Sequence, residues 1–169
     1  MTTASFLRAL FALGQEKLSV TEMRKRSGLA VANAVNAGQR LLSEPPHLRG
    51  EVEPLLASIN FCRDIFYSLS AMAHLPKEKL EQIRSGNVQP IARELADDLE
   101  NLGFNLQTSK PPKQLPKDFA AVNNWEDKSP DRAPDRDNNS WILFYLNALI
   151  DQVKLAHEAV ARLERKADR

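Results

Sequence analysis

The chain has 169 residues, of which 43% are hydrophobic and 27% are charged, with a net charge of +1. These values fit one compact domain and exclude wholesale disorder. The single cysteine excludes an internal disulfide, and no apolar run approaches the roughly 20 residues of a membrane span. Residues 1–17 lack the basic leader of a signal peptide and indicate a helix, so we expect a cytoplasmic protein.

Charge is spread unevenly along the chain. Residues 1–50 carry seven Lys/Arg and three Asp/Glu, whereas residues 51–104 carry five and nine. A basic N-terminal segment and an acidic middle could dock on one another, or could bring a polyanion to one face only. Composition divides the chain into a basic helical segment (1–50), a helical core (51–104), a linker or strap (105–138) and a long C-terminal helix (139–169).

Three short helices are expected in the N-terminal segment, over residues 4–16, 20–27 and 30–43. Ser19 and Glu22 form the S-x-x-E pattern of a capping box, in which the serine hydroxyl accepts from an amide of the first turn and the glutamate reaches back to the serine amide. Gly28 can adopt the left-handed conformation that ends a helix, so we predict a turn there. Pro45 and Pro46 end the third helix.

Two later segments repeat apolar residues at alternating steps of three and four, which places a seam along one side of a long helix. The first seam, on a helix over residues 51–74, consists of Val52, Leu55, Ile59, Cys62, Phe66, Leu69 and Ala73. The second, on a helix over residues 140–167, consists of Ile142, Leu146, Leu149, Val153, Ala156, Val160, Leu163 and Ala167. We expect these two helices to pack antiparallel or nearly so, and any excess seam to be buried by a second copy or a partner.

Two further helices are expected between the seams, over residues 77–84 and 90–102, the second of them ended by Gly103. Residues 105–138 hold five of the ten prolines and few apolar anchors, which is typical of a linker or a functional strap. The sequence therefore predicts an all-α fold, an irregular helical bundle of about six helices with a long proline-rich connection before the C-terminal helix.

Residues Thr21 to Leu41 resemble the helix-turn-helix of many bacterial regulators. The resemblance rests on an inward residue of the first helix, on the turn and on the inward face of the second helix, namely Met23, Gly28, Leu29, Ala34 and Val35. It implies a DNA-recognition helix over residues 30–39. Base contacts would come from Asn33, Asn36, Gln39 and Arg40, and phosphate contacts from Arg24, Lys25 and Arg26.

Two features depart from that motif. Arg24 stands where a small residue usually packs between the two helices, and the helix over residues 30–39 is nearly devoid of charge. Phosphate neutralisation provides most of the affinity for DNA, so an uncharged recognition helix is unusual. The competing interpretation is a capped helical hairpin that packs in the core.

Arg40 and His47 lie seven residues apart and resemble the Arg–His pair of the HEPN ribonucleases, in which the pair attacks RNA from the face of a helix. This resemblance implies a helical ribonuclease or an inactive relative of one. Pro45 and Pro46 fall inside the pair and would turn His47 away from the helix.

No other pattern points to catalysis. The three histidines are scattered and lack the spacing of a zinc site, so we expect no metal, and no phosphate-binding loop implies a cofactor. Asp97 and Asp98 are consecutive on a helix and point in different directions, so we expect them on a solvated face with Glu94 and Glu100. Cys62 is expected to be a small buried hydrophobe.

Aromatic residues gather at the start of the C-terminal helix, where Trp141, Phe144 and Tyr145 crowd the first two turns. This arrangement suits a core and also suits a partner-binding hot spot. Trp125 stands alone in the proline-rich segment, where it either packs on its own domain or anchors a partner.

The strongest patterns serve helix packing. We therefore expect a non-enzymatic helical binding subunit or adaptor of a larger bacterial assembly, which could contain nucleic acid. In size and helical character the chain is similar to the small all-helical subunits of CRISPR effector complexes. The alternatives are a helix-turn-helix regulator with a helical dimerisation domain, and a HEPN-like ribonuclease.

Overall fold

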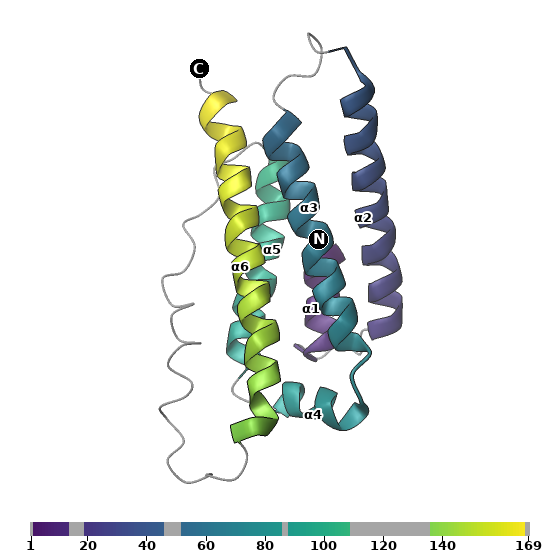
Figure 1. Ribbon diagram of the computed structural model, residues 1–169, viewed down its shortest axis with the longest axis vertical. Helices are drawn as coiled ribbons and strands as arrows, with labels where there is room; N and C mark the ends of the chain where they lie inside the picture. Colours follow the sequence, from purple (N-terminus) through teal and green to yellow (C-terminus); the bar gives the residue numbers. More distant parts are fainter. Residues whose placement is uncertain (1, 14–18, 46–51, 86–87, 109–135, 168–169) are drawn as a thin grey trace.

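The computed structural model describes residues 2–13, 19–45, 52–85, 88–108 and 136–167 (Figure 1). These residues form six helices and no strand: α1 (Thr2–Leu10), α2 (Val20–Ser43), α3 (Val52–Ala73), α4 (Lys77–Ser85), α5 (Gln89–Thr108) and α6 (Arg136–Ala167). The prediction of an all-α bundle is confirmed. None of the helices in the described ranges is long and apolar enough to cross a membrane.

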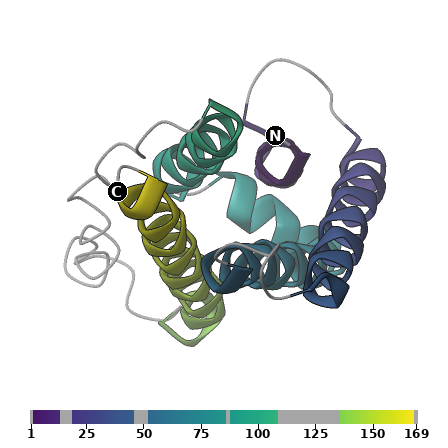
Figure 2. The ribbon, with the colours of Figure 1, turned by 90° about the horizontal axis from the view of Figure 1, so that it is seen from above.

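Five of the helices run roughly along the long axis of the molecule, and α4 crosses beneath them (Figure 1). α3 lies between α2 and α6 and runs opposite to both, and the α3–α6 pair has the most extensive contacts of all. Seen from above, α2, α3, α6 and α5 surround the core, and α1 lies between α2 and α5 (Figure 2). The predicted antiparallel packing of the two long helices is confirmed.

The two predicted seams fare differently. All the predicted seam residues of α6 from Ile142 to Val160 are buried, and the side chains of Leu163 and Ala167 lie outside the described part. Of the seven predicted residues of α3 only Leu69 is buried, beside Ser58, Ile65 and Met72. The predicted seam of α3 is thus only partly realised: its other six residues are half buried, with Ile59 and Phe66 against α2. α3 contacts α1, α2 and α6, so its apolar residues are spread over several sides.

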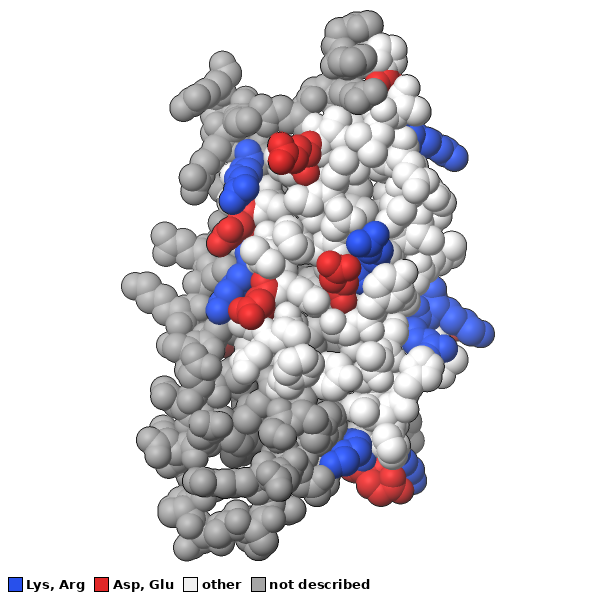
Figure 3. Space-filling view, viewed as in Figure 1, with Lys and Arg blue, Asp and Glu red and all other residues white. Residues whose placement is uncertain are grey.

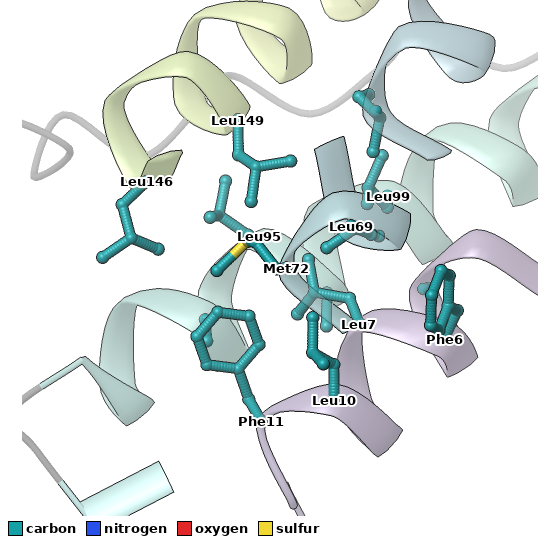
Figure 4. Close-up of a cluster of buried hydrophobic side chains, with 14 of the residues drawn as sticks. Phe6, Leu7, Leu10, Phe11, Leu69, Met72, Leu95, Leu99, Leu146 and Leu149 are labelled. Atoms are coloured by element: carbon teal, nitrogen blue, oxygen red, sulfur yellow. The ribbon is translucent and has the colours of Figure 1, made fainter. Parts of the chain in front are cut away.

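The shortest N-terminal helix is the most enclosed. Phe6, Leu7, Leu10 and Phe11 have no exposed surface, and α1 packs against α2, α3 and α5. Figure 4 shows the side chains of α1 pointing among those of three other helices, including Leu69, Met72, Leu95 and Leu146. Residues 2–11 therefore belong to the same core as α5 and α6.

Polar contacts attach α1 to its neighbours. The Arg8 guanidinium donates to Asp97 at 2.6 Å and to Glu100 at 2.7 Å on α5. Partial burial opposes the charge of Arg8, but these two carboxylates outweigh it and raise the pKa of the guanidinium. Among the described residues, Arg8 thus links the basic N-terminal segment to the acidic middle segment.

The end of α1 differs from the prediction, which extended this helix to residue 16. Ala12 takes the left-handed conformation (φ 53°), its amide donates to the Ala9 carbonyl, and the Leu13 amide donates to the Arg8 carbonyl. These are the two bonds of a Schellman motif, which ends a helix. The Arg84 guanidinium also donates to the Leu10 carbonyl at 3.0 Å, so a side chain from the last turn of α4 satisfies a carbonyl at the end of α1.

The predicted turn at Gly28 is wrong, because α2 continues unbroken from Val20 to Ser43. A Cβ atom at Gly28 would lie 3.1 Å from the Phe66 ring of α3, so this glycine allows a close approach of two helices rather than a turn. Its cost in helix stability, about 1 kcal/mol relative to alanine, is offset by packing that the local sequence does not show. The helix-turn-helix geometry is therefore absent from residues 20–43.

The second glycine stop is also wrong. α5 passes through Gly103 and ends at Thr108, and Asn105 in this extension is buried. Phe104, which follows Gly103, is half exposed. α6 begins at Arg136, four residues before the prediction. Residues 105–108 and 136–138, the two ends of the predicted 105–138 linker, are therefore helical. Residues 109–135 lie outside the described part.

Candidate binding surface on helix α2

The seven residues predicted to contact nucleic acid all lie on α2. The side of this helix that faces the core buries Met23, Ser27, Val31 and Gly38. Six of the seven predicted residues are exposed on the other side: Lys25, Arg26, Asn33, Asn36, Gln39 and Arg40. The structure therefore gathers most of the candidate residues on one uncovered helix face.

Arg24 does not belong to this face. Its side chain is half buried, and its Nη1 donates to Nε2 of His74 at 2.8 Å, at the end of α3. Nδ1 of His74 in turn donates to the Ser70 carbonyl at 2.7 Å, because a guanidinium can only donate and a carbonyl can only accept. The grouping of Arg24 with its two neighbours is thus not realised: this arginine joins α2 to α3.

Arg26 is exposed but already has an anionic neighbour. Its Nε donates to Oε1 of Glu22 at 2.8 Å, one helical turn away. The predicted capping box is therefore only half formed: the Ser19 hydroxyl accepts from the Glu22 amide at 3.3 Å, whereas the Glu22 carboxylate points to Arg26. Lys25 and Arg40 complete the basic character of this face.

Charge is distributed unevenly over the surface (Figure 3). Over α3 and α6, basic side chains lie beside acidic ones, as with Arg63 and Asp64, or Lys154 and Asp151. At the edge formed by α2, basic side chains project with fewer acidic neighbours. Of the basic residues of this segment that the structure describes, Lys25, Arg26 and Arg40 lie on the outer face of α2.

The exposed residues of α2 follow alternating steps of three and four. We call this row the outer seam of α2, and it consists of Arg26, Leu29, Asn33, Asn36, Arg40 and Ser43, all exposed. This spacing aligns residues along one side of a helix, and a seam that packs against another helix uses the same spacing. Sequence reasoning missed this row because most of its members are polar, and because Leu29 had been assigned to a turn.

A shallow hollow of about 350 Å³ lies on the C-terminal half of this face. It is lined by Asn33, Asn36, Ala37, Arg40, Leu41 and Glu44. The first four of these occupy positions i, i+3, i+4 and i+7, which form the hole that receives one side chain of a packed helix. Leu29 lies one turn before the hollow and is 65% exposed, the second-highest value among the large apolar residues described as exposed.

The predicted aromatic surface is only partly described. Phe144 is 69% exposed and meets Tyr145 edge to face, with ring centroids 5.8 Å apart. Tyr145 is half buried and packs against the core. The side chain of Trp141 and the whole of Trp125 lie outside the described part, as does His47 of the proposed ribonuclease pair.

Asp98 departs from the predicted solvated face. Its Oδ2 is buried and has no hydrogen-bond partner, whereas Asp97 is exposed and binds Arg8. Burial, and secondarily the nearby Glu94, raise the pKa of Asp98 to about 6, although His157 of α6 acts in the opposite direction. The helical periodicity carries a signal for this that the prediction did not use: Asp98 lies three residues after Leu95 and four before Leu102, both buried, whereas Asp97 lies on the opposite side of α5.

Metal and thiol chemistry find little support in the described ranges. They contain no group of three His, Cys, Asp or Glu side chains that could hold a metal ion. Cys62 is half buried, and burial raises the pKa of its thiol, which keeps it protonated and unreactive at neutral pH.

The chain matches no protein-family model, no curated protein and no solved structure.

Proposed function

We propose that the protein is a non-enzymatic helical binding subunit, and that the outer seam of α2 receives a helix of a protein partner. One observation carries this proposal: α2 is fixed to the core by one side, and its other side repeats exposed residues at the spacing of a helix-packing seam. A fold that needs only the inner side leaves the outer side available for binding.

The shape of the surface favours a helix as the bound element. Ala32, Asn33, Asn36 and Ala37 are short and exposed at the middle of α2. Short side chains allow two helix axes to approach to about 8 Å, the lower end of the usual range. At one end of this stretch the Leu29 side chain protrudes and can insert into a partner. At the other end the hollow can receive a side chain from the partner.

The charges favour a protein over nucleic acid. The outer face offers Lys25, Arg26 and Arg40, and Arg26 already binds Glu22. Lys25 and Arg40 are separated by about 22 Å of helix at 1.5 Å per residue. Proteins that bind DNA through its backbone make about 6–10 phosphate contacts, so this face supplies too few cations for strong nucleic-acid binding.

Site-specific photo-crosslinking in cells that produce the protein natively tests the proposal. A photoreactive phenylalanine analogue at Asn36 should give a crosslinked protein band, whereas the same analogue at the exposed Glu158 of α6 should not. Equal crosslinking at both sites, or none at Asn36, would contradict the assignment of the surface.

Nucleic acid is the second candidate, favoured by the six exposed residues that share the face. Binding of the purified protein to duplex DNA that weakens steeply with salt, with a smaller salt slope in Arg40→Ala, would identify it. Membership of a larger bacterial assembly, and the ribonuclease alternative with Arg40 and His47, stay predictions.

A further inference from the structure

We infer that the partner helix is α2 of a second copy of this chain, packed antiparallel about a two-fold axis that passes near residues 34 and 35. This inference rests on the proposed function, since it names the occupant of the same surface. A two-fold interface requires one surface to be complementary to itself. The outer seam of α2 meets that requirement in its spacing, its side-chain sizes and its charges.

The spacing of the outer seam reads nearly the same in both directions. Positions 26, 29 and 33 precede the axis by the same steps with which 36, 40 and 43 follow it. In an antiparallel pair, position 33 therefore lies opposite 36 of the second copy, 29 opposite 40, and 26 opposite 43. Two antiparallel helices that pack along one seam are expected to pair residues across the interface in this way.

Side-chain size follows the same symmetry. The short residues Ala32, Asn33, Asn36 and Ala37 lie at the axis, where the two helices come closest. Asn33 and Asn36 carry both donors and acceptors, so each can bond the other across the interface. Leu29 of each copy then lies over the hollow of the other, beside the aliphatic stem of Arg40, and loses the exposure that it has in the single chain.

Charge decides the direction of the pair. In a parallel arrangement Arg26 would face Arg26 and Arg40 would face Arg40, and these like charges would repel. In the antiparallel arrangement Arg26 reaches Ser43 and Glu44 of the second copy, and Arg40 lies over Leu29. Arg26 would then lie between Glu22 of its own helix and Glu44 of the other.

The association should be moderate. A single pair of 24-residue helices forms an interface at the small end of those that persist in solution. We therefore expect a dissociation constant on the order of 1–10 μM, equivalent to about 7–8 kcal/mol.

Sedimentation equilibrium of the full chain tests the inference. The 19.0 kDa chain should convert to a dimer of twice that mass as concentration rises through the micromolar range. Leu29→Glu and Asn36→Glu should each weaken the association at least tenfold, with unchanged helical circular dichroism. The matched control Asn147→Glu, an exposed substitution on α6, should leave it unchanged. A monomer at all concentrations, or a dimer indifferent to both α2 variants, would overturn the inference.

Disulfide trapping tests the direction of the pair. In a Cys62→Ser background, chains with Arg26→Cys mixed with chains with Ser43→Cys should form a disulfide-linked dimer, while neither variant should do so alone. Disulfides formed by Arg26→Cys alone would indicate parallel helices and contradict the proposed pairing.

The two proposals fail in distinguishable ways. A chain that stays monomeric but crosslinks to a different protein through Asn36 would retain the binding surface and exclude the second copy as its occupant. A chain that stays monomeric and gives no crosslink at Asn36 would refute both.

Discussion

Helices α1 and α2 are neighbours in sequence and in space, yet they are used in opposite ways. α1 has nine residues and lies among three other helices, with four of the side chains from residue 6 to 11 fully buried. α2 has 24 residues, rests on α1 and α3, and leaves about half of its circumference uncovered. An isolated helix as short as α1 is unstable in water, so its structure depends on the core around it. The outer face of α2 has no such role, which is why a binding function can be placed there.

The largest effect should come from the centre of α1. Phe6→Ala removes a fully buried ring that packs 6.1 Å from Phe66, and should lower the free energy of unfolding by about 3–5 kcal/mol. Leu29→Ala, the matched change on the outer face of α2, should alter it by less than about 0.5 kcal/mol. Urea unfolding at low protein concentration, where self-association does not contribute, measures both. Similar losses in the two variants would remove the contrast between the helices.

The contact of α2 with α3 comes next. Gly28→Val would press a branched side chain against the Phe66 ring, which is held between Phe6 and Tyr67, and should cost up to about 3 kcal/mol. Gly38→Ala is the control, because its Cβ would meet only the tips of Leu56 and Ile59, which can move. Alanine gains about 1 kcal/mol in helix propensity over glycine, and this gain should offset the cost of moving the two side-chain tips. The thermal unfolding of Gly38→Ala should therefore stay close to that of the parent. A harmless Gly28→Val would contradict close packing at this point.

A pH titration extends the comparison to α5, which also packs against α1. The folded-state pKa of Asp98 is raised to about 6, above its ordinary value. Between about pH 4 and pH 6, Asp98 therefore keeps its proton in the folded chain and has lost it in the unfolded chain. The contribution of Asp98 to stability therefore falls as pH rises through that window. Because Asp98 keeps some contact with solvent, which weakens the effect, Asp98→Asn should stabilise the protein by about 1–2 kcal/mol at pH 7.5 and by almost nothing at pH 4. Asp97→Asn, which loses only an exposed bond to Arg8, is the control, and equal pH profiles for the two variants would exclude a buried Asp98.

The smallest effect is expected where α1 ends. Ala12 holds a left-handed conformation that costs a residue with a Cβ atom about 1 kcal/mol or more. Ala12→Gly relieves this strain at the position where helices prefer glycine, and the greater freedom of glycine in the unfolded chain reduces the gain. A rise in stability of about 0.5–1 kcal/mol is expected in thermal unfolding. A loss instead would show that α1 does not end in this motif.

Most helix ends were predictable from sequence, such as the start of α2 at Val20 and its end at Ser43, and the predictions that failed lie at Gly28, at Gly103 and at the end of α1. The repeat from Ile142 to Val160 predicted one buried side of α6, because a helix with a single neighbouring core must place its apolar residues on one face. The same reasoning succeeded only in part for α3, which packs on three helices. Gly28 and Gly103 carried the local signal of a helix end, and both lie within helices. At Gly28 the reason is the close approach of the Phe66 ring of α3.

The candidate site shows the same division. Sequence picked out residues 24–40 as a polar and basic stretch, and six of the seven selected residues share an exposed face. It could not separate Arg24, which turns to His74, from Lys25 and Arg26, since that depends on where the end of α3 lies. Nor could it identify Leu29 as an exposed side chain beside a hollow, because the assigned turn would have altered its position.

The sequence by itself determined that the chain is a bundle of helices, that α6 has one buried side and that residues 1–50 carry an excess of basic residues. These follow from periodicity and charge, which are properties of consecutive residues. The tertiary structure decided that α2 continues through Gly28 and α5 through Gly103, and which side of α2 remains uncovered. These depend on contacts between segments far apart in sequence, whose packing energy outweighs the cost of about 1 kcal/mol that a glycine imposes on a helix.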